Sequence, residues 1–213
     1  RLARDLVPML NRAVIGRTNF VYGLIAAAAL LAYARTLDNY WFKDDLNLHL
    51  MCTDGRLDWH KLRAFFWPSH MQREQFWRPL PIALGFCEYH FFGPTPFWFH
   101  VTNTIIHAIN AMLAGALACR LAKDANGRTA LGTGLLFALY PAAGEAVVWV
   151  MQRMVLLCTT FSLMALLAWL QGARTGRLGW RALGLGLTGL ALMCKEVAAT
   201  LPAVFFMIDL LEG

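Results

Sequence analysis

Charged residues are scarce in this sequence. Of its 213 residues, 15% are Asp, Glu, Lys or Arg and 58% are hydrophobic. A soluble domain usually has about 25% charged and about 45–50% apolar residues, and the mean hydropathy of this chain is +0.48. The composition excludes an ordinary soluble domain and predicts a polytopic membrane protein, whose helices are buried against lipid and against one another.

Paired cysteine motifs are missing as well. The sequence has five cysteines but no CxxC pair, so neither a disulfide framework nor a cysteine metal site is supported. Four of the five lie in or beside apolar runs, and we interpret them as small buried hydrophobic residues. The five are Cys52, Cys87, Cys119, Cys158 and Cys194.

A basic patch is also missing, although the net charge is +6. Nucleic-acid binding would need the basic residues to cluster on one solvated face. Instead, ten of the 19 Lys and Arg residues fall in the short segments 1–18, 120–128 and 172–181, which lie between apolar runs. We therefore expect no nucleic-acid partner, and the positive-inside rule assigns these segments and the N-terminus to the cytoplasm.

Six apolar runs are predicted to cross the membrane, where about 20 helical residues span the hydrocarbon. No small-residue cleavage site follows the first run, so we expect a retained anchor rather than a signal peptide. The run Pro79–Phe92 is short and ends at a Gly-Pro-Thr-Pro break, so we expect a re-entrant or interfacial helix there. The chain is thus predicted to be one all-α transmembrane bundle over residues 1–213. The six runs cover residues 19–36, 97–121, 129–140, 151–170, 182–194 and 197–211.

Residues 37–79 form the one long polar segment and, in this topology, an extracytoplasmic loop. Within it, residues 57–67 are amphipathic and end at Pro68, which predicts a helix lying in the membrane interface. A helix packed on another part of the protein is the alternative.

The same topology brings ionisable residues that are far apart in sequence to the outer membrane surface. Charged groups at membrane depth are costly and are candidates for a functional site by default. Ion pairs that hold helices together are the alternative. The residues are Asp44, Asp45, Arg78, Glu145, Arg153, Lys195 and Glu196.

Short motifs accompany these residues along the chain. In order, they are Phe42-Lys43-Asp44-Asp45, Trp77-Arg78-Pro79-Leu80, Phe99-His100-Val101-Thr102-Asn103 with His107, Tyr140-Pro141 followed by Glu145, Gln152-Arg153, and Cys194-Lys195-Glu196. The series resembles the membrane region of the tetratricopeptide-and-transmembrane O-mannosyltransferases and their bacterial relatives, which belong to the GT-C class of glycosyltransferases. Each motif alone is weak, but the ordered set is fairly specific and covers nearly the whole chain from residue 37 onward.

The resemblance implies a GT-C-like enzyme of a bacterial inner (plasma) membrane. Such an enzyme moves a sugar from a polyprenyl-phosphate carrier to a hydroxyl of a protein or glycan acceptor on the extracytoplasmic face, usually with inversion. Asp44 and Asp45 match the family's paired acids, which implies that one of them is the general base for the acceptor hydroxyl. The second acid would orient the first, bind the acceptor or hold a divalent cation. A solvated loop or a helix cap is the alternative for the pair.

Cations should meet the phosphate of the leaving lipid, where negative charge develops. Arg78, Arg153 and Lys195 are the candidates, since Arg suits bidentate phosphate binding and Lys acts as a point charge. Snorkelling, or pairing with Glu145 or Glu196, is the alternative.

His100, Asn103 and His107 have the i, i+3, i+7 spacing of one helix face. They are candidates for contacts to sugar hydroxyls or to phosphate, and interhelical hydrogen bonds are the alternative. No third ligand pairs by spacing with the two histidines, so we expect no zinc site.

Three positions depart from the family pattern. Tyr140 stands where His is common before Pro, Val155 where an acid is common, and Gln152 where some relatives have Glu. The chain also begins at Arg1 and ends at Gly213, so we expect a fragment or a shortened relative. A second hypothesis therefore stays open, a non-catalytic GT-C-derived subunit that packs in a larger membrane protein complex. A transporter is not supported, because no inverted repeat is visible and the charges do not lie at the midplane.

Overall fold

A computed structural model describes residues 19–53, 58–67, 77–124 and 127–212; the Arg-rich segment 1–18 lies outside the described residues. Within these ranges every regular element is helical, which confirms the predicted all-α class. A first helix, Asn19–Ala32, opens the described chain. The elements that follow are η1 (Ala34–Asp38), α2 (Asp45–Thr53), α3 (Trp59–Phe65), α4 (Pro79–Phe92), α5 (Pro96–Leu121), α6 (Arg128–Leu139), α7 (Ala143–Val148), η3 (Val150–Gln152), α8 (Arg153–Thr175), α9 (Leu178–Leu192), η4 (Glu196–Thr200) and α10 (Leu201–Glu212).

Two described helices are long and apolar enough to cross a membrane, Pro96–Leu121 and Val150–Thr175, each with 26 residues. They coincide with two of the six predicted spans. The helices Asn19–Ala32, Arg128–Leu139 and Leu178–Leu192 are apolar but have only 10–17 residues, and α10 has 12. A helix of 12 residues reaches about 18 Å, which is short of a hydrocarbon core about 30 Å thick. The six-span arrangement therefore stays a prediction.

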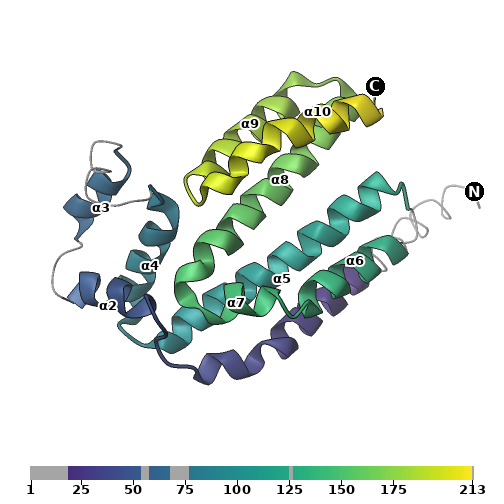
Figure 1. The fold of residues 1–213 in the computed structure, drawn as a ribbon. Helices are drawn as coiled ribbons and strands as arrows, with labels where there is room; N and C mark the ends of the chain where they lie inside the picture. The colour runs from purple at the N-terminus through teal and green to yellow at the C-terminus, as the bar shows by residue number, and fades with distance from the viewer. Residues whose placement is uncertain (1–18, 54–57, 68–76, 125–126, 213) are drawn as a thin grey trace, which may run out of the picture.

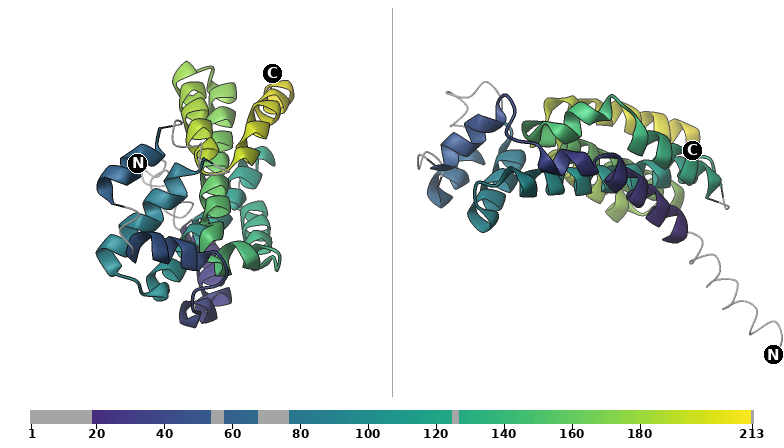
Figure 2. Two further views of the ribbon diagram at one scale, coloured as in Figure 1. Left: turned by 60° about the vertical axis from the view of Figure 1, so that its left-hand side comes forward. Right: turned by 90° about the horizontal axis from the view of Figure 1, so that it is seen from below.

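The two long helices α5 and α8 form the centre of the molecule (Figure 1). The first helix and α6 run beside α5, and α9 and α10 run beside α8. Helices α2, α3 and α4 gather at one end of the bundle, as two further views show (Figure 2). We call this end the α2 end.

The connections between the helices fall alternately at the two ends, because successive helices run back and forth (Figure 1). At the end opposite α2, Arg174 of α8 donates a hydrogen bond to Glu212 of α10 (3.0 Å) and another to the carbonyl of Arg120 in α5 (3.0 Å). The last turns of α5, α8 and α10 are therefore tied together there. Asp44, Asp45 and Arg78, three of the residues predicted to carry function, lie at the starts of α2 and α4 and so at the α2 end.

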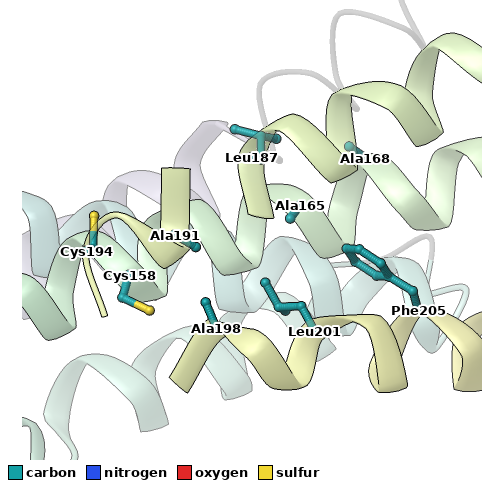
Figure 3. Close-up of a cluster of buried hydrophobic side chains, with 9 residues drawn as sticks. All are labelled: Cys158, Ala165, Ala168, Leu187, Ala191, Cys194, Ala198, Leu201 and Phe205. Carbon is teal, nitrogen blue, oxygen red and sulfur yellow. The ribbon is translucent and has the colours of Figure 1, made fainter. Parts of the chain in front are cut away.

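A cluster of buried side chains, most of them Ala or Cys, joins α8, α9 and α10 (Figure 3). Small residues let helix backbones approach closely in membrane proteins. A Cβ added to Gly184 would lie 3.3 Å from the carbonyl oxygen of Ala165, so α9 lies directly on α8. The ring of Trp169 stacks on that of Phe205 with centroids 4.2 Å apart and packs against the same cluster.

Large hydrophobic side chains cover much of the outer surface. Leu31 is 76% exposed, Leu136 70% and Leu211 77%. Extended apolar surface suits contact with lipid rather than with water. Together with the two candidate spans, this surface is that of a membrane protein.

Helix α3 lies within the stretch 57–67, which we predicted to lie in the membrane interface. It packs on α4, because Leu62 is buried and the Trp59 ring meets the Phe86 ring edge-on at 4.9 Å. The stated alternative, packing on another part of the protein, is therefore present.

Candidate functional site

The paired aspartates occupy opposite environments. Asp44 is exposed, whereas Asp45, the first residue of α2, has 0% of its surface exposed. The Asp45 carboxylate accepts three backbone hydrogen bonds, from the N–H groups of Phe42 (3.1 Å), Val150 (3.3 Å) and Met151 (2.7 Å). Asp45 therefore ties the start of α2 to η3, the turn from which α8 begins.

A tight turn from Phe42 to Asp45 gives the two carboxylates their different directions. The Asp45 N–H donates to the Phe42 carbonyl (3.1 Å), and Lys43 has a left-handed φ of 51°. A non-glycine residue in this region costs roughly 1–3 kcal/mol. The Lys43 ammonium lies 4.6 Å from the centre of the Trp149 ring and 5.0 Å from that of Phe42, and such cation–π contacts offset part of the cost.

Burial raises the pKa of the Asp45 carboxyl above its ordinary value, because the charged form loses water. The hydrogen bonds from Met151, Phe42 and Val150 oppose this rise. Both carboxylate oxygens of Asp45 accept backbone hydrogen bonds. Asp44 is exposed and is therefore the acid of the pair that faces solvent.

Arg153 is a buried residue of the scaffold in this structure, with 1% of its surface exposed. Its guanidinium pairs with Glu88 of α4, and it donates to the carbonyls of Val150 (3.2 Å) and Phe99 (3.4 Å). The guanidinium also lies over the Phe99 ring, 5.2 Å from its centre. Arg153 thereby joins α4, α5 and η3, and the prediction that it meets a lipid phosphate stays a prediction.

Arg78 lies in a more open setting, just before α4. One of its terminal nitrogens donates to both oxygens of Glu196 (2.9 and 2.8 Å), and the other lies 2.8 Å from the sulfur of Met154. The Arg78 side chain is 18% exposed and that of Glu196 64%. A hydrogen bond from its own backbone N–H and the Arg78 guanidinium lower the pKa of the Glu196 carboxyl. Lys195, the residue immediately before Glu196, is partly buried.

The predicted face of α5 is entirely buried and extends one turn further, to Asn110. The His100 ring lies beside the backbone of Asn39 and Tyr40. The other three side chains donate to backbone carbonyls of neighbouring elements: Asn103 to Val147 of α7 (3.3 Å), His107 to Ala138 of α6 (3.1 Å) and Asn110 to Leu156 of α8 (2.9 Å). The stated alternative for Asn103 and His107, interhelical hydrogen bonds, is therefore present.

Glu145 stands apart from these contacts. It is exposed on α7, and its backbone carbonyl accepts a hydrogen bond from the Trp149 N–H (3.2 Å). Tyr140, the residue that departs from the family pattern, is 57% exposed just before the same helix.

The structure therefore brings together five charged residues from distant parts of the chain. We call the buried set Asp45, Glu88 and Arg153 the acid–arginine network. Arg78 and Glu196 form a partly exposed pair, and Arg78 also contacts Met154, the residue that follows Arg153. Asp45 belongs to the network because Arg153 bonds the carbonyl of Val150, whose N–H bonds Asp45.

Sequence reasoning missed Glu88, the partner of Arg153. The signal was available, because Glu88 is the one acid in the apolar helix Pro79–Phe92, and an ionisable residue in such a helix is costly unless it has a partner. Lys43 and Asn110 were also missed as contacts that shape the site.

The arrangement of possible ligand side chains gives no support for a metal site. Across the described ranges, no group of three or more His, Cys, Asp or Glu side chains is arranged to hold a metal ion. The Asp45 oxygens, one predicted source of ligands, accept backbone N–H groups instead.

The fold and the site define an all-helical membrane protein with a buried network of charged residues at one end of its bundle. Human protein O-mannosyl-transferase TMTC1 is 28% identical over 204 residues, which cover 88% of this chain and 23% of that protein. Tmtc2 of Drosophila melanogaster is 31% identical over 202 residues, which cover 87% of this chain and 21% of that protein. Human TMTC4 is 25% identical over 217 residues, which cover 88% of this chain and 29% of that protein. The chain belongs to the TMTC-like family, as its motifs predicted.

The chain spans between about a fifth and three tenths of the length of these relatives. No family model and no solved structure matches it.

Proposed function

We propose that this chain is the membrane region of a glycosyltransferase that moves a sugar from a polyprenyl-phosphate carrier to a hydroxyl of a protein. The names of the relatives, protein O-mannosyl-transferases, suggest mannose and a protein acceptor. The reaction would take place at the α2 end, facing the extracytoplasmic side. The observation that carries the proposal is the placement of an exposed Asp44 beside a fully anchored Asp45, at the bundle end that also holds Arg78.

Asp44 is the proposed general base. As the acceptor oxygen attacks the anomeric carbon, its proton passes to the Asp44 carboxylate, and the bond from the sugar to the carrier phosphate breaks. A carboxylate held within hydrogen-bond reach contributes about 10²–10⁴-fold to such a step. Attack opposite the leaving group inverts the anomeric centre.

Arg78 is the proposed partner of the carrier phosphate. Its ion pair with Glu196 is partly exposed, and exposed pairs contribute only about 0–1 kcal/mol. A phosphate oxygen can therefore replace the Glu196 carboxylate at modest cost, and Lys195 next to it adds positive charge. The charge that develops on the leaving phosphate would then meet a guanidinium.

Asp44→Asn tests the proposal in membranes that contain the full-length protein. Transfer of radiolabelled mannose from polyprenyl-phosphate to protein should fall about 100-fold or more, because the amide cannot accept the proton. Stability should change by less than about 0.5 kcal/mol, because Asp44 is exposed.

The matched control is Asp38→Asn, which neutralises another exposed acid at the end of η1. It should leave transfer unchanged. Full transfer by the Asp44→Asn protein would remove Asp44 as the base.

A non-catalytic role in a larger membrane complex is the second candidate. Two features favour this role. The N–H groups of Arg153 donate to partners within the protein, and Tyr140 stands where His is common in the family pattern. This role predicts that the wild-type protein transfers no sugar. It also predicts that polar substitutions on the exposed face of α10, such as Phe206→Ser, reduce the size of the complex on native gels.

A further inference from the structure

We propose that Glu88 and Asp45 are positioning residues for Asp44, acting through Arg153 and the turn η3. The inference rests on the proposed function where it concerns catalysis. Its structural part, the fixing of the loop before α2, stands on the contacts alone.

The first step is the buried ion pair. Glu88 is 4% exposed and Arg153 1%, so neither charge is solvated by bulk water. Glu88 comes from α4, and Arg153 also donates to the Phe99 carbonyl of α5. One guanidinium therefore fixes the start of α8 relative to two other helices.

The second step passes from Arg153 to the aspartate pair. The Arg153 Nε donates to the carbonyl of Val150 (3.2 Å), and the N–H of the same Val150 donates to Asp45 (3.3 Å). Met151 adds the shorter bond, at 2.7 Å. The orientation that Arg153 gives to η3 thus decides where the two N–H donors point.

The third step reaches Asp44 itself. The Asp45 carboxylate also accepts the Phe42 N–H, and the Asp44 carbonyl accepts the Asn47 N–H (2.9 Å). The backbone is held on both sides of Asp44, although the Asp44 side chain is exposed. A base must be held close to its productive geometry, and a misplacement of about 1 Å can cost about 100-fold in rate.

A purely stabilising role for Glu88 makes different predictions from a positioning role. Buried ion pairs can often be replaced by apolar residues without loss of stability, whereas removing one partner leaves an uncompensated charge. Leu and Met in place of the pair would keep the volume but would lose the bonds from Arg153 to Val150 and Phe99. Stability and positioning can therefore be separated by experiment.

The test compares Glu88→Gln, Asp45→Ala and the double variant Glu88→Leu/Arg153→Met in the full-length protein. Cys87→Ala, on the same helix, is the control. Hydrogen exchange of residues 39–47 and 149–153 is measured by mass spectrometry, together with melting temperature, kcat and KM for the lipid-linked donor.

Exchange in both segments should become about 10-fold faster in Glu88→Gln and in Asp45→Ala, because the loop and η3 open more often. Their kcat should fall by about 10–100-fold with KM nearly unchanged. The double variant should recover the melting temperature but not the slow exchange or kcat, and the control should match the wild type.

Recovery of kcat and slow exchange in the double variant would overturn the proposal, as would wild-type exchange of residues 39–47 in Glu88→Gln. If Glu88→Gln does not fold, the double variant decides. A wild-type protein without transferase activity but with the expected exchange pattern would refute the proposed function and leave the positioning intact.

Discussion

At the residue scale, neighbouring identical side chains have different physical roles. Asp44 keeps its carboxylate in solvent, whereas Asp45 places its own against three backbone N–H groups. Sequence alone could predict the pair but could not rank its members, because two of the N–H groups come from Val150 and Met151, more than 100 residues later.

The pH dependence of stability tests the environment of Asp45. Burial raises its pKa, so folding favours the protonated form relative to the unfolded chain. The stabilisation is then fully present below the unfolded pKa of about 4 and is lost as pH rises through the raised folded value. In detergent, the melting temperature of the wild type minus that of Asp45→Asn should fall from pH 4 to pH 8. A rise of this difference with pH would show that the backbone hydrogen bonds outweigh burial.

At the element scale, the long helices were predictable and their partners were not. Continuous apolar sequence predicted long helices near residues 97–121 and 151–170, and Pro96–Leu121 and Val150–Thr175 are helices long and apolar enough to cross a membrane. The pairing of Arg153 with Glu88 depends on how α4 lies against α8, which no local pattern specifies. Apolar patterning sets which segments are helices, whereas the few polar contacts between them set the site.

Helix contact through glycine gives a sharp test at this scale. A Cβ on Gly115 of α5 would lie 2.6 Å from the backbone oxygen of Ala130 in α6, an atom that cannot move without moving its helix. Gly115→Ala should therefore destabilise the protein by about 1–3 kcal/mol through overpacking. Thermal melting in detergent measures the change.

Gly132→Ala is the matched control, because no atom lies within 4 Å of its added Cβ in α6. It should be neutral or stabilising by up to about 1 kcal/mol, since Ala favours the helix over Gly. Equal melting temperatures for the two variants would argue against this contact between α5 and α6.

At the scale of the whole molecule, the two ends of the bundle differ in chemistry. The α2 end holds the acid–arginine network and the Arg78–Glu196 pair. The opposite end carries exposed cations in and after the last turn of α5, including Arg120 and Lys123, and the Arg174–Glu212 pair. A lipid-linked donor and the proposed base can meet only if the α2 end lies at one membrane surface.

The positive-inside rule predicts that the α2 end lies on the extracytoplasmic side, and cysteine labelling tests that prediction. In a full-length protein whose native cysteines are replaced, Tyr40→Cys should react with a membrane-impermeant maleimide in intact cells, because this residue is 79% exposed and lies just before α2. Lys123→Cys, exposed after α5 at the opposite end, should react only after the cells are opened. Reaction of both in intact cells would mean that the bundle does not separate two compartments. The reverse pattern would put Asp44 on the cytoplasmic side, and the donor and acceptor would then have to be sought there.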